Sequence, residues 1–245
     1  MKARLFVLPG SHPSWSARLM LEHKGIAYKR MDLIPVASKG ILRAAGFSGV
    51  TVPALILDGE RTQGTRPIAR ALEAAVSVPR LFPADAAERV KVEEAEAWGD
   101  EVFQSVPRRI VWNLLSRDRT GMLSYLQGAR LGVPTRLAAA TAPPLVALSK
   151  RFNEGSDANV RADIAALPGM LDQVDAWIAE GIIGGGEPNA ADFQIAPTLA
   201  LLMTMADLRP AIEGRPCADL ARRLLPGFPG YAPPSLPAEW LAPLR

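Results

Sequence analysis

Residues 52–75 constrain the fold more tightly than any other stretch of this chain. The apolar run 54–57 predicts a strand, and Asp58-Gly59 is typical of a two-residue hairpin turn, after which residues 60–62 would form the returning strand. Thr65 is a residue type that caps helices, and Pro67 would fall in the first helical turn, where a missing N–H costs little. We therefore expect a hairpin that leads directly into a helix ending near residue 75.

Two strand–helix units precede this hairpin. Residues 3–8 predict a buried strand and residues 14–24 a helix, which Gly25 ends because glycine readily takes the left-handed conformation of a helix terminus. A second strand at 28–33 and a short helix at 41–45 follow. Two parallel crossovers followed by a hairpin are the topology of a thioredoxin-like domain.

The proline at position 53 bears on the same topology. In thioredoxin-like domains a proline before the third strand usually has a cis peptide bond, and the backbone before it faces a thiol ligand. X-Pro bonds in general are cis in only about 5–6% of cases. The place of Val52-Pro53, directly ahead of the third strand, nevertheless predicts the cis form.

Composition argues against several classes of protein. The chain has 245 residues, of which 49% are hydrophobic, enough for a full core in one large or two modest domains. A single cysteine, Cys217, leaves no disulfide framework and no CxxC pair, and two isolated histidines predict no metal site. The net charge is only +3 and the basic residues are scattered, which argues against nucleic-acid binding. No leader and no apolar run of membrane length is evident, so we expect a cytoplasmic protein that contacts no membrane.

Beyond Phe82-Pro83 the spacing of apolar residues becomes helical, which predicts an all-helical domain over 84–228. Asp85 and Glu88 have the spacing of a capping box at the start of a long helix, with a kink expected at Pro107. The segment 128–152 is interrupted by prolines and predicts irregular structure.

Two later helices are predicted within the same domain. One apolar face is formed at helical spacing by Leu167, Leu171, Val174 and Ile178. Asn189 and Asp192 predict the capped start of a helix from 193 to about 205 that is apolar on nearly every side and therefore buried. Six prolines among the last twenty residues predict an extended surface tail over 229–245.

This order of segments resembles the glutathione transferase superfamily, which joins a thioredoxin-like N-terminal domain to an all-helical C-terminal domain. The motifs that carry the likeness are S-x-P-S-W-S-A-R-L-M-L-E-H-K-G-I-A-Y at 11–28, V-P-A-L at 52–55, T-R-P-I at 65–68 and G-G-x-P-N-A-A-D at 185–192. The resemblance implies a thiol-binding domain over 1–78, a substrate domain over 84–228, and a homodimer. It also implies glutathione as co-substrate, a small hydrophobic electrophile as substrate, and no metal.

The resemblance further implies where the thiol would bind. In Ser-type members a hydroxyl at the end of the first strand faces the glutathione sulfur; Ser11 occupies that position, and Ser14 is a second candidate. The remaining ligand contacts would come from Val52, Pro53, Gly64, Thr65 and Arg66. Gly64 stands where the superfamily normally has an acidic residue, so the α-ammonium of glutathione would lose its partner. The electrophile pocket would be lined by His12, Arg108 and Trp112.

Each of these residues also has a purely structural interpretation. Ser11 and Ser14 are residue types that cap helices, and Thr65 would cap the following helix whether or not it binds a ligand. A lone histidine such as His12 is commonly a surface residue, and Arg108 with Trp112 fits a solvated helix face. Cys217 is expected to be buried packing, because no positive partner is evident.

Three functions remain open at this point. The first is a glutathione-transferase-like enzyme in which Ser11 stabilises the thiolate. The second is a non-catalytic binding or scaffold protein with the same fold, which Gly64 favours. The third is an enzyme that uses a different low-molecular-weight thiol.

Overall fold

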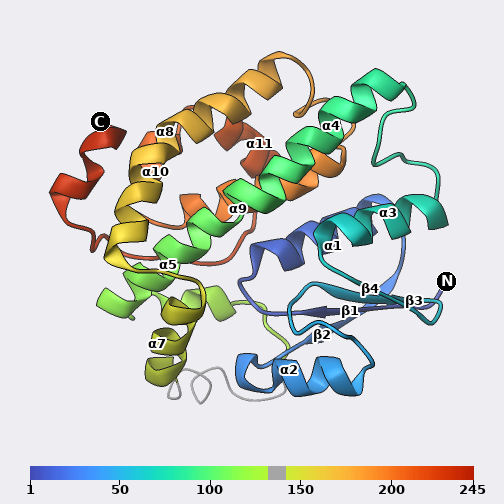
Figure 1. Ribbon diagram of the computed structural model, residues 1–245, viewed down its shortest axis with the longest axis horizontal. Coiled ribbons are helices and arrows are strands. Elements are labelled where there is room, and N and C mark those ends of the chain that lie inside the picture. Colours follow the sequence, from blue (N-terminus) through green and yellow to red (C-terminus); the bar gives the residue numbers. More distant parts are fainter. Residues whose placement is uncertain (132–141) are drawn as a thin grey trace.

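The computed structural model describes residues 1–131 and 142–245. A four-stranded sheet with three helices occupies the N-terminal third, and helices make up most of the remainder (Figure 1). The N-terminal elements are β1 Ala3–Val7, α1 His12–His23, β2 Tyr28–Asp32, α2 Pro35–Ala44, β3 Ala54–Leu57, β4 Glu60–Gln63 and α3 Thr65–Ala75. This is the α/β unit followed by an all-helical region that the sequence predicts.

The sheet has the strand order β2-β1-β3-β4. β1 pairs in parallel with β2, while β3 runs antiparallel to both β1 and β4. Only the first of the two expected parallel crossovers is therefore present, and the expectation of a second one is wrong, because β3 enters the sheet beside β1 in the opposite direction. Asp58 and Gly59 have φ values of 48° and 99°, which is the geometry of the predicted two-residue turn between β3 and β4. Figure 1 shows α1 and α3 on one face of the sheet and α2 on the other.

The helical part of the chain begins after a short linker. Its elements are α4 Ala86–Trp98, η1 Gly99–Phe103, α5 Ser105–Arg117, η2 Met122–Leu126, α7 Ala142–Phe152, α8 Asp157–Ala179, α9 Ala190–Met203, α10 Arg209–Ile212, α11 Pro216–Leu224 and η3 Ala238–Leu244. Among the described residues, no helix combines the length and hydropathy needed to cross a membrane.

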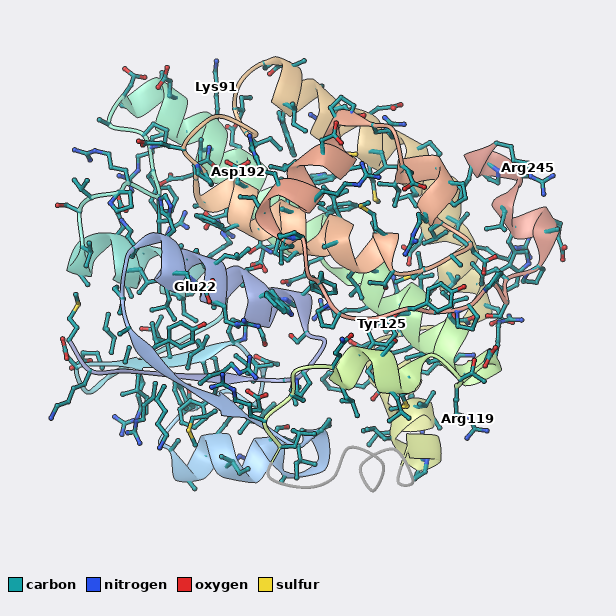
Figure 2. The ribbon with its side chains drawn as sticks, turned by 180° about the vertical axis from the view of Figure 1, so that it is seen from behind. Glu22, Lys91, Arg119, Tyr125, Asp192 and Arg245 are labelled. Carbon is teal, nitrogen blue, oxygen red and sulfur yellow. The ribbon has the colours of Figure 1, made fainter. Side chains whose placement is uncertain are left out.

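Helix α9 is the centre of the helical domain. Every residue from Ala190 to Leu202 is buried, as expected for a helix that is apolar on nearly every side. Asn189 and Asp192 form the predicted capping box, and the Asp192 carboxylate also accepts a 2.7 Å hydrogen bond from the amide of Gly184. Helix α9 packs directly against α1, and Figure 2 places Asp192 at the start of α9, with Glu22 on the neighbouring α1.

Charged side chains hold α1 to the linker and α3 to the helical part. The side chain of Lys24, the C-cap of α1, is fully buried and donates to Glu73 and to the carbonyls of Val76 and Pro79, each carbonyl at 2.6 Å. Arg70 of α3 pairs with the buried carboxylate of Glu96 on α4. Burial raises the pKa of Glu96, and the nearby Arg70 opposes that rise.

Several elements differ from the sequence expectation. Helix α2 begins at Pro35, well before residue 41, because proline suits the first turn of a helix. The long helix is interrupted by the π-helical turn η1 rather than by a kink at Pro107. At Gly99 a Cβ atom would lie 2.9 Å from Gln194 Cγ, so this turn brings the backbone close to α9. Pro107 itself lies in the first turn of α5, where its missing N–H is tolerated.

The middle segment and the tail also contain more helix than expected. Residues 142–152 form α7, whereas the rest of the predicted irregular stretch includes residues outside the described ranges. The tail is not extended throughout, because residues 238–244 form the 3-10 helix η3, which packs against α8. Arg117 lies over the ring of Trp240 at 4.9 Å and helps to hold η3 in place.

Candidate functional site

Ser11 is positioned at the start of α1 by its own backbone. Its amide donates to the carbonyl of Leu8 at 3.2 Å, and its carbonyl accepts from the amide of Trp15 at 3.2 Å. The residue is the N-cap of α1, and its hydroxyl oxygen accepts from the amide of Ser14. Ser11 therefore has the capping role that the sequence allowed, and it remains partly exposed.

Ser14 lies behind Ser11 and contacts it directly. The hydroxyl of Ser14 donates to Ser11 Oγ at 3.0 Å and accepts from the amide of Leu8 at 3.4 Å. Because Ser11 Oγ accepts from both the amide and the hydroxyl of Ser14, its own proton remains available for a further acceptor. Ser14 is buried while Ser11 is partly exposed, so of the two hydroxyl groups that of Ser11 is the one open to a ligand.

The Val52-Pro53 peptide bond is cis, as predicted. Phe6 of β1 pairs with Ala54 of β3, which puts Pro53 at the same end of the sheet as the loop that carries Ser11. The carbonyl of Pro53 accepts from the amide of Gly64 at 2.9 Å. Within the described residues, neither the N–H nor the C=O of Val52 has a hydrogen-bond partner, so this peptide can pair with a ligand backbone.

Gly64, not Thr65, is the N-cap of α3, and the predicted capping role of Thr65 is wrong. Gly64 has φ 91° and ψ 153°, a conformation that is essentially restricted to glycine. Thr65 is the first helical residue, and its hydroxyl is enclosed without a hydrogen-bond partner among the described residues. The open donors at this helix start are therefore the amides of Thr65 and Arg66, since Pro67 has none.

Arg66 reaches across to the helical domain. Its Nη1 atom lies 2.7 Å from Glu101 Oε1 in η1, and its Nε atom lies 3.9 Å from Glu96. The guanidinium thus neutralises two carboxylates beside the start of α3. The side chain joins the two domains at the edge of the candidate thiol site.

His12 is fully buried where the domains meet, so the interpretation as a surface residue is wrong. Its Nε2 atom lies 3.1 Å from the carbonyl of Gln104, and the Gln104 side chain donates to Asp100 Oδ1 at 2.9 Å. Burial lowers the pKa of His12 well below its usual value, and the charge of Arg108 lowers it further. His12 is therefore neutral at pH 7 and donates to Gln104.

Arg108 and Trp112 are both half-buried on α5. Burial lowers the pKa of Arg108, with the charge of Asp100 opposing that effect. The neighbouring Arg109 instead forms a two-point ion pair with Asp163 of α8, at 2.6 and 2.7 Å. Neither Arg108 nor Trp112 lines the cleft that lies between α1 and the segment 227–231.

That cleft has a volume of about 590 Å³ and was not predicted from the sequence. It is lined by the end of β1, one side of α1, β2, the segment 124–129 and the segment 227–231. Ser14 borders it, but Ser11, Val52, Pro53 and Thr65 do not. The cleft therefore meets the pair of serines through Ser14 but does not include the backbone groups expected to bind the thiol.

Cys217 carries no reactive chemistry. The residue is fully buried, and burial together with the nearby Asp175 raises the pKa of its thiol to about 12. Its own amide donates to Asp175 at 2.9 Å, which is a structural contact at the start of α11. In the described parts of the chain, no group of three or more potential metal ligands comes together.

Comparison with known proteins bears on the N-terminal third of the chain. Residues 5–80 match the family described as glutathione S-transferase, N-terminal domain. The N-terminal domain is therefore similar to the N-terminal domain of glutathione S-transferases. No curated protein sequence shows significant similarity to the chain.

Solved structures extend the superfamily's fold to the whole chain. A glutathione S-transferase from Rhodospirillum rubrum is similar with a TM-score of 0.62 at 20% identity, covering 98% of this chain and 99% of that one. A Methylobacterium radiotolerans glutathione S-transferase in complex with glutathione sulfonate has a TM-score of 0.53 at 18% identity, with 92% and 91% covered. A maleylacetoacetate isomerase from Anaeromyxobacter dehalogenans with bound glutathione has a TM-score of 0.50 at 19% identity, with 99% and 93% covered.

Proposed function

We propose that this protein is a glutathione-transferase-like enzyme. Glutathione would lie along the backbone of Val52 and Pro53, with its γ-glutamyl end at the start of α3. Ser11 would donate to the sulfur, and the resulting thiolate would attack a small hydrophobic electrophile. Two of the similar structures described above hold glutathione or its sulfonate, which supports this class of ligand.

The observation that carries the proposal is the chain of hydroxyl groups at the start of α1. The Leu8 amide donates to Ser14, and Ser14 donates to Ser11 at 3.0 Å. Successive hydrogen bonds polarise one another, so the Ser11 proton is a better donor than that of an isolated serine. Ser11 would act as a donor and would form no covalent bond.

The energy required is within reach of such a donor. A free thiol has a pKa of about 8.5, and lowering it by about two units requires roughly 2.7 kcal/mol of preference for the thiolate. A hydrogen bond to a charged acceptor contributes about 1.5–3 kcal/mol, and a helix N-terminus adds about 0.3–1 kcal/mol. Ser11 and the start of α1 would therefore suffice without a general base.

Gly64 supports one alternative, in which the same site takes a different low-molecular-weight thiol. The site has no carboxylate at this position for the α-ammonium of glutathione, and the φ of 91° suits glycine. A thiol without that ammonium group would lose nothing there. The other alternative, a non-catalytic binding protein, shares the fold but requires no activated thiol.

Two measurements distinguish these functions. Retention on immobilised glutathione, together with conjugation of a model aromatic halide, is expected for the enzyme. Retention without conjugation would favour the binding protein, and absence of both would count against glutathione as the ligand. We also propose that the protein is a cytoplasmic homodimer. Light scattering on the purified protein gives its molar mass in solution and so tests whether it is a dimer.

A further inference from the structure

His12 is a buried polar residue to which the proposed reaction gives no role. Its exposed fraction is only 1%, and it is the first residue of α1, so it directly follows the N-cap Ser11. A polar group enclosed in this way costs free energy unless it has a hydrogen-bond partner. The partner of His12 therefore determines what the residue does for its neighbour Ser11.

That partner lies in the helical domain. The Nε2 atom of His12 donates to the carbonyl of Gln104 at 3.1 Å, and Gln104 lies 92 positions further along the chain, between η1 and α5. Figure 1 shows α1 between the sheet and the helices α4 and α9. The hydrogen bond therefore ties the first turn of α1 to the helical domain, at the residue next to Ser11.

Gln104 is itself held from several sides. Its side-chain amide donates to Asp100 Oδ1 at 2.9 Å, and its side-chain oxygen accepts from the amide of Gln194 on α9 at 3.3 Å. Its backbone amide donates to the carbonyl of Gly99 at 2.9 Å. Both glutamines are buried. The carbonyl that accepts from His12 is thus a fixed point of the helical domain.

The contacts of Ser11 itself are local. Its hydroxyl oxygen accepts from the amide and the hydroxyl of Ser14, and its amide donates to the carbonyl of Leu8. These contacts orient the hydroxyl within the unit formed by β1 and α1, and His12 adds an anchor on the other domain. Such an anchor matters because a misplacement of about 1 Å costs a catalytic contact much of its effect.

His12 stays neutral over the pH range in which a thiol titrates. Burial and then the charge of Arg108 on α5 lower its pKa well below the ordinary value. Asp100 of η1 acts on Arg108 and accepts from the side chain of Gln104, while α9 contributes the uncharged Gln194. The N–H group that donates to Gln104 is therefore unchanged while the sulfur gains or loses its proton.

We propose that His12 is a positioning residue for the donor at Ser11. Its hydrogen bond to Gln104 holds the first turn of α1 in place, so that Ser11 Oγ stays within reach of the thiol sulfur. His12 touches neither the thiol nor the electrophile. This inference rests on the proposed function, since it requires a thiol bound beside Ser11.

The pKa of bound glutathione, measured by thiolate absorbance in a pH titration, tests this role. His12→Phe fills the space without donating, and should raise that pKa by about half a unit or more, a loss of about threefold in thiolate below the pKa. His12→Gln can still donate to the Gln104 carbonyl and should restore the wild-type value. His23→Gln, at the last residue of the same helix, is the matched control and should leave the titration unchanged.

A double variant shows whether His12 acts through Ser11. In a Ser11→Ala background, His12→Phe should not raise the pKa any further, because the hydroxyl that it positions is absent. An equal rise in both backgrounds would overturn the inference, since His12 would then act on the thiol by another route. An unshifted pKa in a folded His12→Phe protein would overturn it as well.

Gln104→Met keeps the test decisive if His12→Phe does not fold. This variant removes the side-chain contacts to Asp100 and Gln194 without changing α1, and should raise the pKa in the same direction by a smaller amount. In that case an unshifted pKa in Gln104→Met would refute the role of His12. A wild-type protein that does not lower the pKa of glutathione refutes the proposed function itself, so the two failures are distinguishable.

Discussion

The amide of Gly64 donates a 2.9 Å hydrogen bond to the carbonyl of Pro53, and so ties the first turn of α3 to the loop at the end of the sheet. Two segments that the resemblance assigns to one ligand are thereby held in a fixed relation. The conformation of Gly64 makes this connection possible, because its φ of 91° and ψ of 153° are open to glycine and costly for other residues.

Gly64→Ala should therefore lower the free energy of unfolding by about 1–3 kcal/mol, the usual cost of this backbone conformation. The added Cβ would meet Pro67 Cδ at 3.5 Å, which is ordinary contact, so the cost is conformational and not steric. Urea denaturation measures it. Gly186→Ala serves as control, since its Cβ would meet nothing within 4 Å, and equal losses in both variants would refute the explanation.

Gly64→Glu tests the missing carboxylate directly. The variant should carry the same backbone cost as Gly64→Ala but hold glutathione more tightly, because the added charge faces the ammonium group. The elution of both variants from immobilised glutathione, compared with wild type, measures this. If Gly64→Glu elutes as early as Gly64→Ala, the γ-glutamyl end does not lie at the start of α3.

Ser11→Ala should raise the pKa of bound glutathione by about one to two units, because it removes the proposed donor to the sulfur. Ser14→Ala should raise it by less, since Ser11 keeps its hydroxyl and loses only the neighbour that donates to it at 3.0 Å. Thiolate absorbance during a pH titration gives both values. Ser77→Ala, at an exposed position, should leave the titration unchanged; an unchanged titration in Ser11→Ala would remove Ser11 from its role.

His12 should make the protein less stable in mild acid. Its folded-state pKa lies well below the ordinary value of about 6.5, because burial and then Arg108 disfavour its charged form. Between those two pKa values the unfolded chain binds a proton that the folded chain does not, so the free energy of unfolding falls as pH falls, by at most about 1.4 kcal/mol per pH unit.

His12→Gln should flatten this pH dependence while its amide can still donate to the Gln104 carbonyl. Urea denaturation between pH 7 and pH 5 measures the slope for each protein. Burial also lowers the pKa of His23, so His23→Gln shows how much of the slope has a different origin. Identical slopes in wild type and His12→Gln would contradict the prediction.

Cys217 should not react with a thiol reagent in the native protein at pH 8. A thiol with a pKa of about 12 is almost entirely protonated there, and the side chain is enclosed. Addition of urea should release one reactive thiol per chain at the unfolding transition. Rapid labelling of the folded protein would show that the start of α11 opens.

The predictions from sequence succeeded where short-range chemistry decides the structure. Asp58-Gly59 dictates its hairpin through two positive φ values, and Asn189 caps α9 through contacts within three residues. The turn and the cap depend on neighbours that the sequence places side by side. The cis bond at Pro53 was predicted differently, from its place directly before the third strand of the expected topology.

The predictions failed where long-range packing decides. Thr65 has the chemistry of a cap, but the hydrogen bond from Gly64 to Pro53 shifts the cap by one residue. The position of the helix break depends on how closely Gly99 approaches α9. The spacing of apolar residues along α4 does not predict that approach. In the cleft, Trp15 contacts Phe228, which is more than two hundred residues away in the sequence. No local sequence pattern predicts a contact between such distant residues.

The buried ammonium of Lys24 has a consequence for how the molecule moves. It holds the carbonyls of Val76 and Pro79, two residues of the segment that connects α3 to α4, while the Glu73 carboxylate also accepts from the amide of Leu81. That connection is therefore anchored along its length and cannot serve as a hinge. The two halves will tumble as one body, and a protease that cuts exposed linkers should fail to separate them.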